Sequence, residues 1–289
     1  MLEPLIHPLT ARDGLRLSAA RFEGRGPGIL LAHGFGQTRQ AWLPTQRRLV
    51  EAGYANLAWD VRGHGQSDRN PAASRYAGAQ FVDDVATAAA ALGPAPVLVG
   101  ASMGGLTGLM AQSRDRLFSA MVLVDITPRW EASGVERILA FMNAHPDGFD
   151  SYEHAAEQIA AYLPHRRERK TPAQLAHLLK PRPDGRLGWH WDPRLLGEFI
   201  PFTNDLQHLI EDACRQLDIP VLLVSGGRSD LVTSRTVEHF LELAPHARHV
   251  QLPEATHMLA GDDNDAFTDT LIHFLQDLAI PTANHGDSR

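Results

Sequence analysis

The sequence predicts an α/β fold in which a mostly parallel sheet is covered by helices on both faces and is interrupted by an inserted helical segment. Short apolar runs alternate with segments of helical periodicity from about residue 29 to residue 124, and again from residue 205 to residue 278. Such alternation indicates strands that are buried on both sides and joined by crossover helices. Between residues 128 and 200 this alternation stops, and aromatic residues and prolines become frequent.

We therefore expect the chain to be divided into three parts. Residues 1–127 and 201–289 form the two parts of one α/β core, and residues 128–200 form a helical cap inserted between them. A length of 289 residues, 44% of them hydrophobic, is enough for one large core with an insertion.

The elements follow from local patterns. Strands are expected where β-prone apolar runs end at a glycine or a polar turn, at residues 15–22, 29–32, 54–59, 97–99, 120–124, 221–224 and 249–252. Helices are expected in the core at 42–51, 80–92, directly after 102, 205–217, 235–243 and 266–278, and in the cap at 133–144, 152–163 and 173–179. Residues 185–191 are expected to be irregular or extended.

Composition limits the possible partners. The formal net charge of −7 argues against nucleic acid as a partner, and the one concentrated basic run, residues 166–170, contains an acid and is interpreted as a solvated loop or helix end. The first nine residues do not have the pattern of a signal peptide, and no apolar run approaches the ~20 residues that a membrane helix needs. A single cysteine, Cys214, excludes an internal disulfide. We expect a soluble cytoplasmic protein that is either a monomer or a homodimer.

The stretch around Ser102 indicates nucleophilic chemistry. A short β-prone run, residues 97–99, stops at Gly100-Ala101-Ser102-Met103-Gly104, and apolar residues at helical spacing follow. A strand, a sharp turn and a helix in this order present the serine hydroxyl above the sheet edge, and the flanking glycines let the strand and the helix pass closely.

A serine needs a base to accept its proton and an acid to orient that base. His257 lies in the loop after the last predicted strand, and Asp230 follows the strand at 221–224 after two glycines. Asp125, at the end of the strand that follows the serine, is the strongest competitor for the role of the acid, but we prefer Asp230. Asp60, at the end of another strand, is interpreted as a carboxylate that fixes a loop.

These motifs together resemble the α/β-hydrolase fold superfamily, in particular serine hydrolases with a helical cap that are similar to carboxylesterases. The resemblance covers nearly the whole chain and rests on the following motifs, in their family order: His33-Gly34-Phe35-Gly36, Asp60-Val61-Arg62-Gly63-His64-Gly65, Gly100-Ala101-Ser102-Met103-Gly104-Gly105, Gly226-Gly227-Arg228-Ser229-Asp230 and Ala255-Thr256-His257. It implies that Ser102 is the nucleophile, His257 the general base and Asp230 the orienting acid. The backbone N–H groups of Phe35 and Met103 would form the oxyanion hole, while their side chains would shape the pocket. His33 and His64 would support the loops around the site.

The expected activity is the hydrolysis of small to medium, largely apolar carboxylic esters through an acyl-enzyme on Ser102, without a metal or an organic cofactor. The expected partner is therefore a small-molecule ester. The cap supplies aromatic and sulfur side chains that could line an apolar pocket, although at least half of them should form the cap's own core: Trp130, Phe141, Met142, Phe149, Trp189, Trp191 and Phe199. Lactone hydrolysis, hydrolysis of carbon–carbon bonds and cofactor-free perhydrolysis remain alternatives. Arg129 and Arg137 in the cap are candidates for holding a substrate carboxylate. A ligand-binding protein on the same fold is a further alternative.

Overall fold

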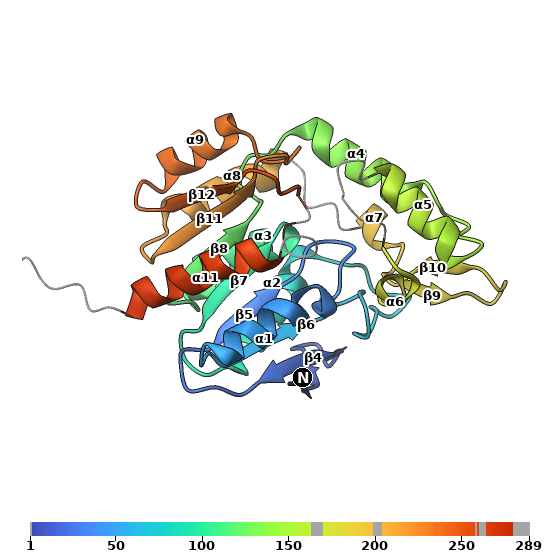
Figure 1. Cartoon of the computed structure of the whole chain (residues 1–289), viewed down its shortest axis with the longest axis horizontal. Coiled ribbons are helices and arrows are strands. Elements are labelled where there is room, and N and C mark those ends of the chain that lie inside the picture. The colour runs from blue at the N-terminus through green and yellow to red at the C-terminus, as the bar shows by residue number, and fades with distance from the viewer. Residues whose placement is uncertain (1, 163–169, 199–203, 258, 260–263, 280–289) are drawn as a thin grey trace, which may run out of the picture.

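The computed structural model describes residues 2–162, 170–198, 204–257, 259 and 264–279. Its centre is an eight-stranded sheet, ordered β1-β4-β6-β5-β7-β8-β11-β12 (Figure 1). The strands from β6 to β12 are parallel, whereas β4 pairs antiparallel with both β1 and β6. The predicted fold class is therefore confirmed.

The strands lie close to the expected positions. Those of the large sheet are β1 (Leu5–Ile6), β4 (Ala19–Phe22), β5 (Ile29–Ala32), β6 (Asn56–Trp59), β7 (Val97–Ala101), β8 (Ala120–Val124), β11 (Val221–Gly226) and β12 (Arg248–Leu252). The strand expected at 15–22 is divided, because β3 (Arg16–Leu17) pairs with β2 (Leu9–Thr10) in a separate two-stranded sheet before β4 begins.

Helices cover both faces of the sheet. The 3-10 helix η1 (Arg39–Trp42), α1 (Leu43–Glu51) and α11 (Asn264–Ala279) contribute to the apolar cluster on one face. The cluster on the other face includes residues of α2 (Gly78–Ala90), α3 (Met103–Asp115), α8 (Asn204–Arg215) and α9 (Ser234–Leu243). Within the described residues, no helix is both long enough and apolar enough to cross a membrane.

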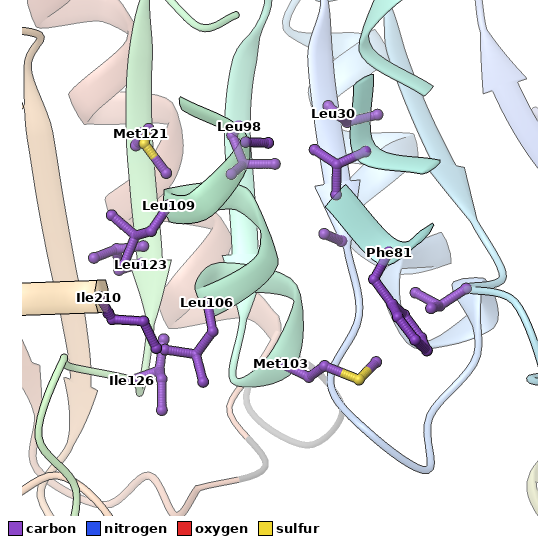
Figure 2. Close-up of a cluster of buried hydrophobic side chains, with 14 of the residues drawn as sticks. Leu30, Phe81, Leu98, Met103, Leu106, Leu109, Met121, Leu123, Ile126 and Ile210 are labelled. Atoms are coloured by element: carbon purple, nitrogen blue, oxygen red, sulfur yellow. The ribbon is translucent and has the colours of Figure 1, made fainter. Parts of the chain in front are cut away.

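Alternate residues of each central strand belong to opposite faces of the sheet. Leu98 and Leu123 lie in the cluster that contains α3, where Figure 2 shows them beside Leu109, whereas Val99 and Val122 lie in the cluster that contains α11. Because successive side chains of a strand point to opposite faces, a continuous apolar run is what a doubly covered strand requires.

The inserted segment, residues 128–198 apart from 163–169, lies between β8 and α8 in the chain. It contains α4 (Ala132–Asn143), α5 (Tyr152–Tyr162), α6 (Pro172–Leu175), β9 (Leu179–Pro181), β10 (Leu187–Trp189) and α7 (Leu195–Glu198), which gather at one side of the molecule in Figure 1. Part of it has a small core of its own, centred on Phe149, Ile159 and Leu175.

A β-hairpin in this segment was not predicted. The helix expected at 173–179 ends at Leu175, and Leu179 already belongs to β9, which pairs antiparallel with β10. The turn depends on Gly185, which has a φ of +82°, and on the hydrogen bond from the Arg182 N–H to the Arg186 carbonyl, of 2.8 Å. The strands have three residues each, too few to show an alternating pattern.

Candidate active site

Ser102 lies between the end of β7 and the first residue of α3. Its backbone has φ 47° and ψ −118°, outside the regions that non-glycine residues normally adopt, and such strain is typically found at functional sites. A Cβ atom added to Gly100 would lie 2.6 Å from Gly105 Cα, and one added to Gly104 would lie 2.4 Å from the Ala32 carbonyl oxygen. The glycines that flank Ser102 therefore allow the close passage that the sequence predicted.

His257 is hydrogen-bonded to Asp125. The distance from His257 Nδ1 to Asp125 Oδ2 is 2.7 Å, and the Asp125 side chain is completely buried at the end of β8. Because a carboxylate only accepts hydrogen bonds, Nδ1 carries the proton, and Nε2 of the neutral ring remains basic. This hydrogen bond fixes the orientation of the His257 ring.

The loop after β11 holds Asp125 in place. The Gly226 N–H donates to Asp125 Oδ1 at 2.8 Å, and the Ser229 hydroxyl donates to Oδ2 at 2.5 Å. Ser229 Oγ also accepts hydrogen bonds from the N–H groups of Leu231 and Val232. The carboxylate is thus bound by three donors, two of them from this loop.

The placement of Asp230 corrects the sequence-based assignment of the acid. Asp230 forms an ion pair with Arg137 of α4, so its carboxylate is turned towards the inserted segment. Among the described residues, the carboxylate hydrogen-bonded to His257 is that of Asp125. In the loop after β11, the Ser229 hydroxyl contacts the buried Asp125 carboxylate, whereas the next residue, Asp230, binds Arg137. Both aspartates follow strands, so the sequence identified both candidates but did not predict which of them is hydrogen-bonded to His257.

The loop after β5, residues 33–37, lies beside Ser102. A Cβ atom added to Gly34 would lie 3.3 Å from Ser102 Cβ. The Gly34 carbonyl accepts a hydrogen bond from the Gln37 N–H, and the Gly34 N–H donates to Gln37 Oε1. Phe35 follows Gly34 directly, which is the position expected for one oxyanion donor.

Met103 begins α3, where N–H groups have no partner within the helix. Its side chain is almost completely buried in the core cluster, as Figure 2 shows. Any contribution of Met103 to chemistry at Ser102 would therefore come from the backbone, and not from a pocket-lining side chain.

Two buried histidines of the core support the β5 loop. His33 Nε2 accepts from the Val61 N–H at 3.0 Å, so Nδ1 carries the proton and donates to the Gly34 carbonyl at 2.8 Å. His64 Nε2 accepts from the Gly36 N–H at 3.2 Å. This confirms that both histidines support loops.

A third histidine at the same loop was missed by the sequence analysis. His190, directly after β10 in the inserted segment, accepts a hydrogen bond on Nδ1 from the Gly65 N–H at 2.8 Å. Its Nε2 lies 3.1 Å from the Gly36 carbonyl oxygen and donates to it. A histidine between two tryptophans has no periodic signal, so the sequence alone could not connect it with residues 36 and 65.

The three histidines are neutral in the folded protein. Burial lowers the pKa of His33, and burial together with the nearby histidines lowers the pKa of His64 well below its usual value. Burial also lowers the pKa of His190, to about 4. Neutral rings are consistent with hydrogen bonds in which each ring has one donor and one acceptor nitrogen.

Of the side chains expected to line a pocket, Met142 and Trp191 reach the β5 loop. A Cβ atom added to Gly36 would lie 2.5 Å from Met142 Cε and 3.9 Å from Trp191 Nε1. The rings of Phe35 and Trp191 lie 5.3 Å apart. The indole nitrogen of Trp191 is buried and has no hydrogen-bond partner in the described parts of the chain. These side chains form an apolar wall beside the loop.

The other aromatic candidates pack mainly within the inserted segment. Phe141 stacks on Tyr162 with ring centroids 4.2 Å apart and contacts Trp189, which in turn contacts the buried Phe149. Trp130 is buried in the large core cluster. Phe199 lies outside the described residues.

Asp60 fixes loops, as predicted. It accepts hydrogen bonds from the Arg39 and Gln66 N–H groups, at 2.7 and 2.9 Å, and forms a buried ion pair with the Arg39 side chain. No group of three or more potential metal ligands occurs among the described residues.

A sequence model of the Alpha/beta hydrolase family matches residues 29–270. Esterase Rv0045c of Mycobacterium tuberculosis is 29% identical over 85% of this chain and 82% of its own. The 3-hydroxybutyrate-oligomer hydrolase of Cupriavidus necator is 31% identical over 79% of this chain and 82% of its own. The 2-(acetamidomethylene)succinate hydrolase of Mesorhizobium japonicum is 27% identical over 82% and 84%.

Solved structures share the fold. The crystal structure of E-2-(acetamidomethylene)succinate hydrolase superposes with a TM-score of 0.80 at 23% identity, over 94% of this chain and 99% of the other. The crystal structure of the Mycobacterium tuberculosis esterase Rv0045c superposes with a TM-score of 0.73 at 25% identity, over 96% and 92%.

Proposed function

Because the chain belongs to the alpha/beta hydrolase family and its relatives include esterases and other hydrolases, we propose that it is a serine hydrolase of carboxylic esters. The observation that carries this proposal is the 2.7 Å hydrogen bond between His257 and the buried Asp125, at the same sheet edge as the strained Ser102. These three side chains follow β12, β8 and β7, in a run of adjacent parallel strands that also includes β11. Carboxyl ends of parallel strands meet at one edge of the sheet.

The proposed reaction has two halves. Ser102 Oγ attacks the ester carbonyl while His257 Nε2 takes the hydroxyl proton, and the Phe35 and Met103 N–H groups bind the resulting oxyanion. The tetrahedral intermediate collapses to an acyl-enzyme, and His257 returns the proton to the leaving alcohol. A water molecule activated by His257 then attacks the acyl-enzyme, which releases the acid and restores Ser102. Asp125 stabilises the imidazolium ion that forms in each half.

The surroundings of the β5 loop support the proposed substrate class. Met142 and Trp191 present apolar surface there, which suits a small or medium apolar acyl group. We propose that the inserted segment acts as a cap over this site, because Met142 lies against Gly36, Trp191 lies against Phe35, and His190 is hydrogen-bonded to Gly36.

The charges of this segment also favour an uncharged ester. The two arginines considered for binding a substrate carboxylate are already engaged with acids: Arg137 with Asp230, and Arg129 with Glu211 at 2.6 Å. A dianionic substrate of the type named for the Mesorhizobium japonicum relative would have to displace such pairs. Hydrolysis of such a dianion is the second candidate function. The similarity to this relative supports it, but the existing pairs of Arg129 and Arg137 with acids do not.

The test is hydrolysis of p-nitrophenyl esters from acetate to decanoate, with a γ-lactone and a vinylogous diketone beside them. We expect turnover of the short and medium esters, and we expect Ser102→Ala to lower kcat/KM by at least about a thousandfold because the nucleophile is lost. Ser113→Ala, at a partly buried serine of the helix that follows Ser102, is the matched control. Retained turnover in pure, folded Ser102→Ala would remove Ser102 as the nucleophile. Cleavage of only the lactone or the diketone would assign one of the alternatives, and binding without turnover would favour a ligand-binding protein.

A further inference from the structure

The inserted segment contacts the β5 loop through a polar side chain, His190, as well as through the apolar side chains of Met142 and Trp191. His190 is 1% exposed, and its ring bridges two core loops through the Gly36 carbonyl and the Gly65 N–H. Because Nδ1 accepts from an N–H group, Nε2 must carry the proton and donate to Gly36. The geometry thus determines the tautomer of His190.

Gly36 is held on both sides by imidazoles. Its N–H donates to His64 Nε2, and its carbonyl accepts from His190 Nε2. The two rings lie 5.8 Å apart. Gly36 has a φ of +75°, and a glycine can leave such a conformation at little cost unless its peptide groups are bound.

Gly36 lies next to one of the proposed oxyanion donors. It directly follows Phe35, whose N–H is the proposed oxyanion donor, and the preceding peptide is held by His33 on the Gly34 carbonyl. The Gly36 carbonyl that His190 binds belongs to the Gly36–Gln37 peptide, whose N–H donates to the Gly34 carbonyl at 3.2 Å. The Gly34 carbonyl belongs to the same peptide unit as the Phe35 N–H. A rotation of the Gly36–Gln37 peptide would therefore break this bond and allow the peptide that carries the Phe35 N–H to turn. Oxyanion stabilisation depends on donors that are already oriented before reaction.

We propose that His190, a residue of the inserted segment, is a positioning residue that fixes the β5 loop. The hydrolytic site is then complete only when the inserted segment is docked on the core. The inference rests on the proposed serine-hydrolase function. His64, which binds the Gly36 N–H, belongs to the core, whereas His190, which binds the Gly36 carbonyl, belongs to the inserted segment.

The two hydrogen bonds of His190 can be separated by two amide substitutions of similar polarity. The Asn carboxamide falls close to the position of Nδ1, so His190→Asn keeps an acceptor for Gly65 and loses the donor to Gly36. The Gln carboxamide reaches the position of Nε2, so His190→Gln keeps a donor for Gly36 and loses the acceptor for Gly65. We expect His190→Asn to lower kcat of ester hydrolysis about 10- to 100-fold with little change in KM, and His190→Gln to stay within about fivefold of the wild type.

Binding of a trifluoromethyl ketone, which forms a tetrahedral oxyanion on the serine, distinguishes positioning from general damage. Its Ki should rise in His190→Asn by the same factor by which kcat/KM falls, while the Ki of the product acid stays constant. Asp192→Asn is the matched control, because Asp192 is buried in the same segment and binds Tyr76 instead of the β5 loop. Equal losses in His190→Asn and His190→Gln, or a parallel loss of product-acid binding, would overturn the proposal.

A readout independent of turnover separates this inference from the proposed function. In protein labelled with ¹⁵N-phenylalanine and ¹⁵N-glycine, the Phe35 and Gly36 amide signals should shift and exchange faster with solvent in His190→Asn than in His190→Gln. If the wild type hydrolyses no ester and is not labelled on Ser102 by a fluorophosphonate, the proposed function fails, and the amide signals still decide whether His190 holds the loop. Unchanged Phe35 and Gly36 signals in His190→Asn would refute that role.

Discussion

At the scale of single residues, the candidate site depends on which carboxylate serves His257. Asp125 is buried and accepts hydrogen bonds from the His257 ring, the Gly226 N–H and the Ser229 hydroxyl, whereas Asp230 is bound to a largely exposed arginine. An exposed ion pair is worth about 0–1 kcal/mol, and losing it should not affect the imidazole. Substitutions of the two aspartates should therefore have very different effects on activity.

We predict that Asp125→Asn lowers kcat of ester hydrolysis about 10³- to 10⁴-fold, because the amide cannot accept all three hydrogen bonds and favours the wrong tautomer of His257. Asp230→Asn should stay within about threefold of the wild type. Steady-state kinetics on one p-nitrophenyl ester, with circular dichroism to confirm folding, would measure both. If Asp230→Asn were instead the more damaged variant, the acid would have to be reassigned to Asp230.

The sequence was informative about this site wherever a residue follows a strand. Ser102, Asp125 and His257 all do, and the parallel sheet places such residues at one edge. The hydrogen-bond partners of those residues depend on loop conformations that leave no pattern in the sequence. Asp125 itself has a φ of +49°, and Ser229 reaches it from a loop more than 100 residues away in the sequence.

At the scale of elements, the prediction was best for the strands and helices of the core. The runs at 29–32, 97–99 and 221–224 became β5, β7 and β11, because strands buried on both faces must be apolar throughout. In the inserted segment the helices expected at 133–144 and 152–163 became α4 and α5, but the prediction failed at residues 173–189, where tertiary contacts decide between a helix and a hairpin. The side chain of Trp189 on β10, for example, packs between Phe141 and Phe149.

The packing of α3 on the sheet predicts a stability effect. A Cβ atom at residue 104 would meet the carbonyl oxygen of Ala32 in β5 at 2.4 Å, and a backbone atom cannot move aside cheaply. Gly104→Ala should therefore lower the free energy of unfolding by about 2–4 kcal/mol and impair hydrolysis by displacing Met103. Urea unfolding would measure the change.

Gly78→Ala is the control for that substitution. Gly78 begins α2, and an added Cβ atom would meet nothing within 4 Å. It should change the free energy of unfolding by less than about 1 kcal/mol, with a tendency towards stabilisation. Similar losses in the two variants would show that the contact with Ala32 is not what requires a glycine at residue 104.

At the scale of the whole molecule, three buried neutral histidines join the core and the inserted segment. His33 and His64 come from the core and His190 from the inserted segment, with the His64 ring lying 5.4 Å from that of His33 and 5.8 Å from that of His190. Burial lowers the pKa of His190 most; the hydrogen bond to Gly36 and the charge of Asp60 raise this pKa, whereas His33 and Lys180 lower it. Burial outweighs the two effects that raise the pKa, so the cluster remains neutral when the protein is folded.

This arrangement predicts how stability depends on pH. The pKa of His190 falls from about 6.5 in the unfolded chain to about 4 in the folded protein, so between these values the unfolded chain binds a proton that the folded protein does not. Its contribution to stability is complete above about pH 6.5 and is lost as the pH falls towards 4. His33 and His64 act in the same direction.

The free energy of unfolding of the wild type should fall between pH 7.5 and pH 5. We predict that in His190→Gln it falls by about 2 kcal/mol less over the same range. Urea unfolding at closely spaced pH values would measure this difference in slope, which is independent of any constant destabilisation caused by the substitution. His208→Gln, on an exposed position of α8, controls for the loss of a histidine as such. Equal pH dependence in the wild type and His190→Gln would mean that His190 takes up its proton in the folded protein as readily as in the unfolded chain. The hydrogen bond that it accepts from Gly65 would then be lost on acidification without cost to the fold.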